Sequence, residues 1–250
     1  MSRSLALFLA VLTVAGLAAP QAHAKDFRAK YEDVTLPLIT DYMVRSKGLK
    51  LDTQNKMMDY LKLTECDIYK AVKNSQFKQQ AIQSAIQRKI DQPIPGDGNL
   101  YVKIPTVFYI TNYDFDTQSF NLAPKSRMKR ANILDLISKN ISICDESQSE
   151  KMSLPGIYNI RLNYPISFYR IPLQKNLAET VFNKLDFLGG SEFKVIYGLL
   201  YIQIEPVPPL LDTASSTATA LAHGQLDVID LFLDHDRKIL LRQLDFGENF

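Results

Sequence analysis

The residues with the greatest potential for chemistry form an acidic cluster near the end of the chain: Asp227, Asp230, Asp234, His235 and Asp236. Carboxylates at close spacing could bind a divalent cation, or could serve as acid and base in a hydrolase if the fold brings them together. The spacing does not match a calcium-binding loop, and the last three residues are also typical of a tight turn. Strand alternation would send Asp227 and Asp230 to opposite faces, which argues against a metal site.

Signatures of common catalytic sites are missing from the sequence. It contains no Gly-x-Ser-x-Gly, no phosphate-binding loop, no Cys-x-x-Cys and no His-Glu-x-x-His. Ser-x-x-Lys occurs at Ser75–Lys78 and Ser126–Lys129, but without the partner motifs of serine acyltransferases. After the first 24 residues the only histidines are His223 and His235. We therefore expect no metal and no cofactor, and catalytic residues remain unknown at this stage.

A basic cluster, Lys125–Arg130, could bind phosphate groups or lipid headgroups, or could simply be a solvated charged loop. The aromatic residues Tyr164, Phe168 and Tyr169 are interpreted as packing or strand-surface residues rather than as a ligand platform. The whole chain has 29 basic and 27 acidic residues, so it creates no general field that would attract nucleic acid. The expected partner is an unidentified protein or small molecule, not nucleic acid.

The first 24 residues have the layout of a secretory signal peptide. Arg3 gives a positive start, Leu5–Ala18 an apolar core, and Ala22-His23-Ala24 a small-x-small cleavage site before Lys25. The alternative is an uncleaved membrane anchor, but the apolar core is short for a span of about 20 residues. No later run reaches transmembrane length. The pattern predicts a periplasmic or secreted protein.

The chain has two cysteines, Cys66 and Cys144. In an oxidising compartment such a pair is a candidate disulfide, while two separately buried thiols are the alternative. A bond between them would close a long loop, worth about 4 to 5 kcal/mol in the chain-entropy model. It would also hold the helical first part of the chain to the strand-rich remainder.

Hydrophobic spacing predicts the elements that position these residues. Helices are expected over 33–46, 53–63, a short segment after a Thr64/Asp67 capping box, 77–90, and 177–185 after an Asn176 cap. The clearest helical stripe is Phe77, Ala81, Ala85, Ile86 and Ile90. Its apolar residues recur every three to four positions, which is typical of a helix.

Strand patterns dominate from Leu100 onward. Strands are expected over 102–110, 120–122, 157–162, 166–171 and 193–204, with a hairpin of 225–233 and 238–244 around the turn 234–237. The run 193–204 is apolar on both faces, which is typical of a central strand. Residues 132–144 fit a helix or a strand equally well, and 213–219 has the composition of a loop.

The segment Leu61–Lys70 (Leu-Lys-Leu-Thr-Glu-Cys-Asp-Ile-Tyr-Lys) resembles an uncharacterised family of exported bacterial proteins described only as a domain of unknown function. The resemblance continues through the helix after Phe77, through Tyr113-Asp114-Phe115 and into the strand at Pro165-Ile166. It implies a location in the bacterial, Gram-negative envelope. It brings no activity, cofactor or catalytic residue.

These observations together predict an α+β protein, with a helical N-terminal part packed on a mostly antiparallel sheet. We expect a single domain over 25–250, helical over 25–96 and strand-rich over 97–250. The leading hypothesis for function is a non-catalytic binding or envelope-associated protein. The alternative is a hydrolase or other enzyme whose carboxylates, such as Asp227 and Asp230, converge only in the fold.

Overall fold

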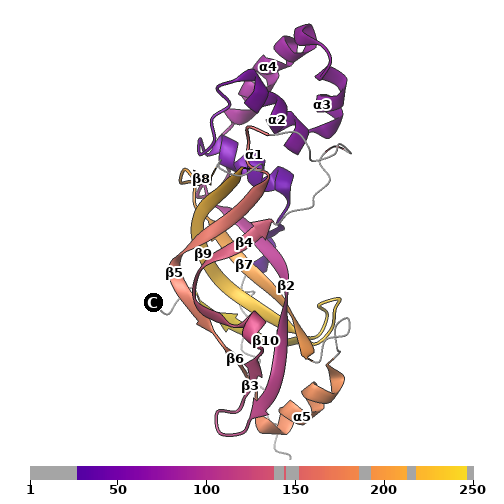
Figure 1. The fold of residues 1–250 in the computed structure, drawn as a ribbon, viewed down its shortest axis with the longest axis vertical. Coiled ribbons are helices and arrows are strands. Elements are labelled where there is room, and N and C mark those ends of the chain that lie inside the picture. Colours follow the sequence, from indigo (N-terminus) through magenta and orange to yellow (C-terminus); the bar gives the residue numbers. More distant parts are fainter. Residues whose placement is uncertain (1–26, 138–143, 145–151, 186–192, 213–217, 247–250) are drawn as a thin grey trace, which may run out of the picture.

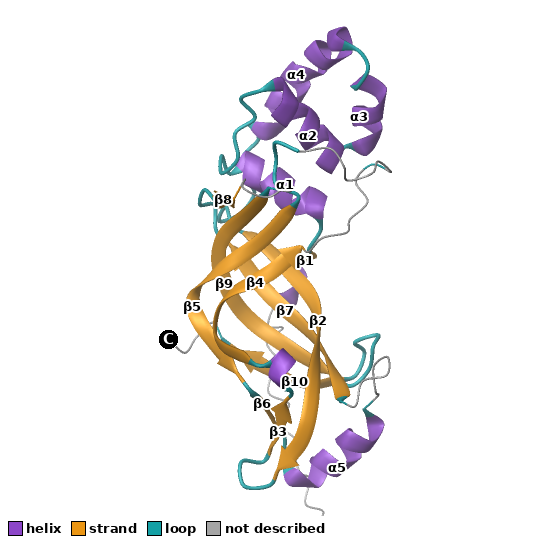
Figure 2. Ribbon diagram, viewed as in Figure 1, coloured by secondary structure: helices purple, strands orange, loops and turns teal. Residues whose placement is uncertain are grey.

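A computed structural model describes residues 27–137, 144, 152–185, 193–212 and 218–246. Helices α1 to α4 gather at one end of an elongated molecule, a curled sheet forms its middle, and helix α5 lies at the opposite end (Figure 1). Figure 2 shows the same separation of helix and strand along the long axis. The expected α+β class, with a helical N-terminal part and a mostly antiparallel sheet, is confirmed.

The four N-terminal helices are α1 (Leu36–Arg45), α2 (Gln54–Thr64), α3 (Cys66–Val72) and α4 (Gln76–Ile90). Three of them begin where a hydroxyl side chain accepts a hydrogen bond from a backbone N–H two or three residues into the helix, which satisfies an otherwise unpaired donor. These capping residues are Thr35, Thr53 and Ser75. The short 3₁₀ helix η1 (Phe27–Lys30) and strand β1 (Glu32–Asp33) precede them.

Two details of the helical part differ from the sequence-based expectation. The Thr64/Asp67 capping box is wrong: Glu65 is the N-cap of α3 without a side-chain bond, and the Thr64 hydroxyl donates to the Tyr60 carbonyl instead. Helix α4 forms as predicted, but only part of its stripe is covered: Ile86 is buried and Ile90 packs against the core, whereas Phe77 is 87% exposed. Few neighbouring elements pack on α4, so helical spacing alone did not reveal which face is covered.

Within the described residues the sheet has ten strands. The nine strands that follow β1 are β2 (Leu100–Asp114), β3 (Ser119–Leu122), β4 (Met128–Ile137), β5 (Ile157–Phe168), β6 (Arg170–Pro172), β7 (Lys194–Ile204), β8 (Leu210–Asp212), β9 (Thr219–Phe232) and β10 (Leu240–Asp245). The main order is β4-β5-β9-β7-β2-β3-β6. All pairs are antiparallel except β1·β2 and β5·β9.

Strand β7 lies inside the sheet between β9 and β2, as its two apolar faces predict. The expected C-terminal hairpin is also present as β9 and β10. The ambiguous segment 132–144 begins as strand β4, while 138–143 lies outside the described residues. Residues 213–217 of the expected loop 213–219 also lie outside the described residues.

Helix α1 connects the helical part to the end of the sheet. The Tyr42 hydroxyl donates to the Ile204 carbonyl at 3.0 Å, and the Thr40 hydroxyl lies 3.2 Å from that of Tyr158, which is fully buried. One hydrophobic cluster contains side chains from both parts, among them Ile39, Met43, Tyr60, Phe108, Ile160 and Ile229. The helices are therefore held by shared apolar packing as well as by hydrogen bonds.

At the far end, the N-cap of α5 (Lys175–Lys184) is Gln174, which makes no side-chain capping bond, so the predicted Asn176 cap is wrong. Within the described part of the chain, no helix has both the length and the apolar character needed to cross a bilayer.

Candidate functional site

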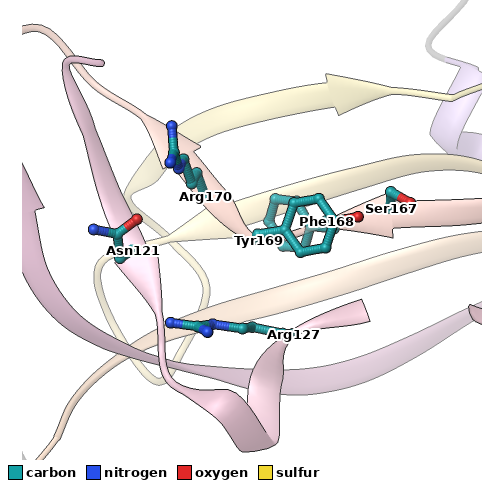
Figure 3. A pocket seen from close by; sticks show the side chains of 6 residues that line it. All are labelled: Asn121, Arg127, Ser167, Phe168, Tyr169 and Arg170. Atoms are coloured by element: carbon teal, nitrogen blue, oxygen red, sulfur yellow. The ribbon is translucent and has the colours of Figure 1, made fainter. Parts of the chain in front are cut away.

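A hollow of about 590 Å³ opens at the side of the sheet where β3, β4, β5 and β6 meet (Figure 3). Asn121, Arg127, Ser167, Phe168, Tyr169 and Arg170 line it. In Figure 3 the Arg127 side chain extends toward the strand that carries Asn121, and the Arg170 side chain extends from the neighbouring strand in a different direction. Its volume is in the range of ordinary small-molecule sites, about 300 to 1,000 Å³.

The hollow exists because one extended segment changes its pairing partner at Tyr169. Before this residue the segment is β5, whose Phe168 pairs with Met128 of β4. After it the segment is β6, whose Arg170 pairs with Asn121 of β3. Strands β4 and β3 therefore separate at this point, and the side chains of the exchange surround the opening between them.

Local hydrogen bonds fix the turn that brings Arg127 to the hollow. Between β3 and β4 the chain makes the 3₁₀ helix η2 (Pro124–Ser126), and the Ser126 hydroxyl accepts from the Tyr109 N–H at 2.8 Å. The Arg127 Nε then donates to the Leu122 carbonyl at 2.7 Å. This bond uses one guanidinium donor and holds the plane of the group, while both Nη atoms keep their donors.

The charge of the hollow is positive. Among the described residues neither Arg127 nor Arg170 has a carboxylate within salt-bridge distance, and none of the lining residues is acidic. Arg170 does act on Asp114: hydrogen bonds from Thr117 lower the pKa of that carboxyl, and the positive charge of Arg170 makes a smaller contribution in the same direction. Two guanidinium groups that share one opening favour a ligand with a planar or tetrahedral anionic group.

The predicted acidic cluster is divided between two structural roles. Strand alternation predicted that Asp227 and Asp230 lie on opposite faces of the sheet, and this prediction is wrong. Tyr201 pairs with Val228 but Ile202 pairs with Leu226, so Asp227 is an extra residue in the ladder. Such a bulge turns both carboxylates to the same face, because it advances the alternation by one position.

On that face both carboxylates bind the segment that follows the predicted signal. Arg28 donates to Asp230 through Nε at 2.7 Å and Nη2 at 3.1 Å, and the Tyr31 hydroxyl donates to Asp227. Burial, and then the bond to Asp227, raises the pKa of Tyr31. Burial and the nearby Asp230 raise the pKa of Tyr201 to about 12. The neutral phenols of Tyr31 and Tyr201 therefore lie beside the Arg28–Asp230 ion pair.

The other three members of the cluster form the β9–β10 turn, as the alternative interpretation of the sequence predicts. Asp234 accepts from the N–H groups of Lys238 and Ile239, and these bonds lower the pKa of its carboxyl. Asp236 pairs with Lys238 at 3.0 Å, and the His235 ring packs edge-on against Tyr197. No group of three or more potential metal ligands occurs in the described parts of the chain.

The serines of the two Ser-x-x-Lys matches have backbone partners. Ser75 caps α4 and Ser126 accepts from Tyr109, so each hydroxyl has a local structural role. In the basic cluster, Lys125 lies 3.3 Å above the Tyr109 ring, Arg127 lines the hollow and Lys129 is exposed on β4. The cluster thus contributes one residue to the hollow.

Cys66 and Cys144 are joined in a disulfide, with their Cα atoms 5.4 Å apart. Cys66 opens α3, and Cys144 lies beyond β4, so the bond ties the helical end to the sheet. Two further hydrogen bonds support this connection, because Asp59 of α2 accepts from the N–H groups of Ser153 and Leu154.

Of the three aromatic residues considered from the sequence, Phe168 packs in the core at 5% exposure, while Tyr164 and Tyr169 lie on the surface. Asn121, Ser167 and Arg170 were not recognised as site residues from the sequence. Asn121 and Arg170 lie 49 positions apart and meet only through the β3·β6 pairing, so no short motif could have indicated them.

A family model described as "Domain of unknown function (DUF4852)" matches residues 52–184, more than half of the chain. The matched region runs from α2 to the end of α5 and includes every residue that lines the hollow. No curated protein and no solved structure matches the chain significantly.

Proposed function

We propose a function for this chain, which belongs to the DUF4852 family: it is an exported, non-catalytic protein that binds an anionic ligand in the hollow between Arg127 and Arg170. The observation that carries the proposal is the pair of guanidinium groups in one opening, without an acidic residue among the described lining side chains. A bound anion would relieve the repulsion between two like charges and accept their free N–H groups.

Binding through arginine suits a ligand that presents at least two oxygen atoms. A guanidinium group donates two parallel hydrogen bonds to a carboxylate, a sulfate or a phosphate. Arg127 is already oriented by its bond to Leu122, so less side-chain freedom is lost when a ligand binds. Arg170 is fixed at its backbone by pairing with Asn121.

Two observations support export. The first 24 residues have the charge, apolar core and cleavage pattern of a signal peptide, and a Cys66–Cys144 disulfide is typical of an oxidising compartment. The first segment after the expected cleavage site, from Phe27 to Tyr31, packs against the sheet. Mass spectrometry of the periplasmic fraction should find Lys25 as the first residue. Full-length protein in the membrane pellet would contradict export.

The partners of Asp227 and Asp230 support a non-catalytic function. Both carboxylates hold the N-terminal segment through Arg28 and Tyr31, so they are committed to structure rather than available to a substrate. We also propose that residues 25–250 fold as a single domain, since side chains from the helices and from the sheet share one hydrophobic cluster.

The proposed binding site is tested by titrating the purified protein with methyl phosphate at constant ionic strength, with NMR shifts as the readout. We expect saturable binding that perturbs the signals of Arg127, Arg170 and Asn121. Arg127→Gln and Arg170→Gln should each weaken binding about tenfold or more, because each removes charge-assisted hydrogen bonds.

Lys129→Gln is the matched control, since it removes one charge from the same basic cluster at an exposed residue outside the hollow. It should leave the dissociation constant unchanged within about twofold, as expected for a screened surface charge. An equal loss in all three variants would mean general electrostatic attraction, and no saturable binding by the unmodified protein would reject the proposal.

A further inference from the structure

The hollow offers more than positive charge, and the remaining lining groups indicate what kind of molecule carries the anion. The Asn121 amide, the Ser167 hydroxyl and the Tyr169 hydroxyl form no hydrogen bond to any described residue. An amide supplies two donors and an acceptor, and a hydroxyl supplies one donor and accepts as well. These groups suit a ligand rich in hydroxyls, which donates and accepts hydrogen bonds at many positions.

Tyr169 adds an exposed aromatic face. Its side chain is 41% exposed, whereas Phe168 beside it is 5% exposed and packs edge-on against Phe108 with the ring centroids 5.1 Å apart. The Tyr169 carbonyl accepts from the Leu122 N–H at 2.8 Å, which fixes the backbone at the point of partner exchange. In Figure 3 the Tyr169 ring lies along the segment between Arg170 and Ser167. The backbone of Tyr169 is therefore held in place, and its ring is accessible to a ligand.

From this arrangement we infer that the ligand is an anionic saccharide, with its phosphate or carboxylate between Arg127 and Arg170 and one face of the sugar ring on Tyr169. This inference rests on the proposed anion-binding function. A pyranose has a C–H face that packs on an aromatic ring, and hydroxyls at its rim that reach amide and hydroxyl groups. The volume of about 590 Å³ accommodates one or two sugar rings.

A nucleotide also combines a ring with a phosphate, but the hollow fits it less well. A nucleobase is usually held between aromatic or apolar side chains on both faces. Here Tyr169 is the one exposed ring among the described lining residues, and its neighbours Asn121, Ser167 and Arg170 are polar. The surroundings of the ring thus favour a sugar.

The experiment compares methyl phosphate, a hexose 1-phosphate and uridine monophosphate on the same protein, since all three carry the same monoester group. Binding to the mature protein is measured by NMR titration at constant ionic strength. We expect the hexose phosphate to bind about tenfold more tightly than methyl phosphate, since stacking and new hydrogen bonds add to the anionic contact. Tyr169→Ala should remove that advantage and leave the methyl phosphate constant unchanged, whereas Tyr169→Phe should keep most of it.

Tyr164→Ala is the matched control, because Tyr164 is an exposed tyrosine of β5, close to Tyr169 in the sequence, that does not line the hollow. It should change neither constant. Equal affinities for methyl phosphate and the hexose phosphate would overturn the saccharide inference and leave the anion-binding function standing. Tighter binding of the nucleotide would also overturn it, in favour of base stacking. Failure of all three probes would reject the inference together with the proposed function.

Discussion

Arg28 and Asp230 form a bidentate ion pair although they lie 202 positions apart in the chain, with Nε–Oδ2 and Nη2–Oδ1 distances of 2.7 and 3.1 Å. The Asp230 side chain is 2% exposed, so its charge depends on this partner. The pair attaches the start of the described chain to β9, next to the phenols of Tyr31 and Tyr201. It therefore explains why a segment with only one turn of 3₁₀ helix and a two-residue strand has a defined position.

The first prediction concerns this pair. Arg28→Gln leaves a buried carboxylate without its cation, and we expect a loss of about 2 to 3 kcal/mol in the free energy of unfolding. That loss should lower the melting temperature by roughly 5 to 10 °C. Lys103→Gln is the control, because Lys103 pairs with the exposed Asp33 at 3.6 Å and surface pairs contribute little. Equal melting temperatures for the Arg28 variant and the unmodified protein would contradict the role of the pair.

The second prediction concerns Cys66 and Cys144. Their separation of 78 residues gives an entropic stabilisation of about 4 to 5 kcal/mol, which measured disulfides often do not reach. Replacing both by alanine should lower the melting temperature by several degrees or more. Dithiothreitol should destabilise the unmodified protein and leave the double variant unchanged. Two free thiols per chain, counted on unfolded and non-reduced periplasmic protein, would show that the bond is absent.

The third prediction is a loss of stability at alkaline pH. Burial, with bonds to nearby carboxylates, raises the pKa values of Tyr60 and Tyr201 from 10.0 to about 12. A tyrosine with a raised pKa holds its proton more tightly in the folded state. Its stabilising contribution is therefore complete below pH 10 and is lost as the pH rises through about 12.

Absorbance at 295 nm, which follows phenolate, should measure this effect. The tyrosines of the folded protein should ionise at higher pH than those of the same protein in denaturant. The last part of this ionisation should coincide with unfolding as measured by circular dichroism. Tyr60→Phe should move the unfolding midpoint to higher pH if the variant folds normally at pH 8. Identical titration curves for folded and unfolded chains would show that these phenols are not protected.

The fourth prediction concerns Gly224 of β9, which pairs with Leu162 of β5 and with Ile204 of β7. A Cβ atom there would lie 2.2 Å from the backbone oxygen of Gln203 and 2.6 Å from the Cδ1 atom of Ile160. Gly224→Ala should therefore displace backbone, at a cost of about 1 to 3 kcal/mol or more. His223→Ala, one position earlier on the same strand, provides the comparison and should cost less in a urea unfolding experiment. Equal stability of both variants would contradict the close approach.

The sequence predicted most elements of this fold because their local signals and tertiary packing agree. The apolar run of β7 and the turn residues after Phe232 each indicate one structure. Helix α4 shows the limit: its spacing predicted a helix correctly, but of its apolar stripe only Ile86 and Ile90 are covered. How much of a helix is covered depends on where neighbours such as α1 and α3 lie, and periodicity carries no information on that.

The site was less predictable for a similar reason. The basic cluster led to Arg127, but its partner Arg170 arrives from another part of the chain through a strand that exchanges neighbours. The bulge at Asp227 inverted the expected arrangement of the two aspartates, since one extra residue reverses every alternation after it. A bulge of this kind has no characteristic amino-acid composition, so the sequence pattern does not reveal it.

The place of β9 has a consequence for how the chain assembles during synthesis. It lies between β5 and β7 in the sheet, yet it is the ninth of ten strands along the chain. A chain made from its N-terminus can form the pairs β4·β5 and β2·β7 before residues 219–232 are available to join them. Until then the facing edges of β5 and β7 are open to pairing with other chains. A product truncated before residue 219 would therefore expose the edges of β5 and β7, and its two groups of strands would be joined only where β5 continues into β6 and pairs with β3.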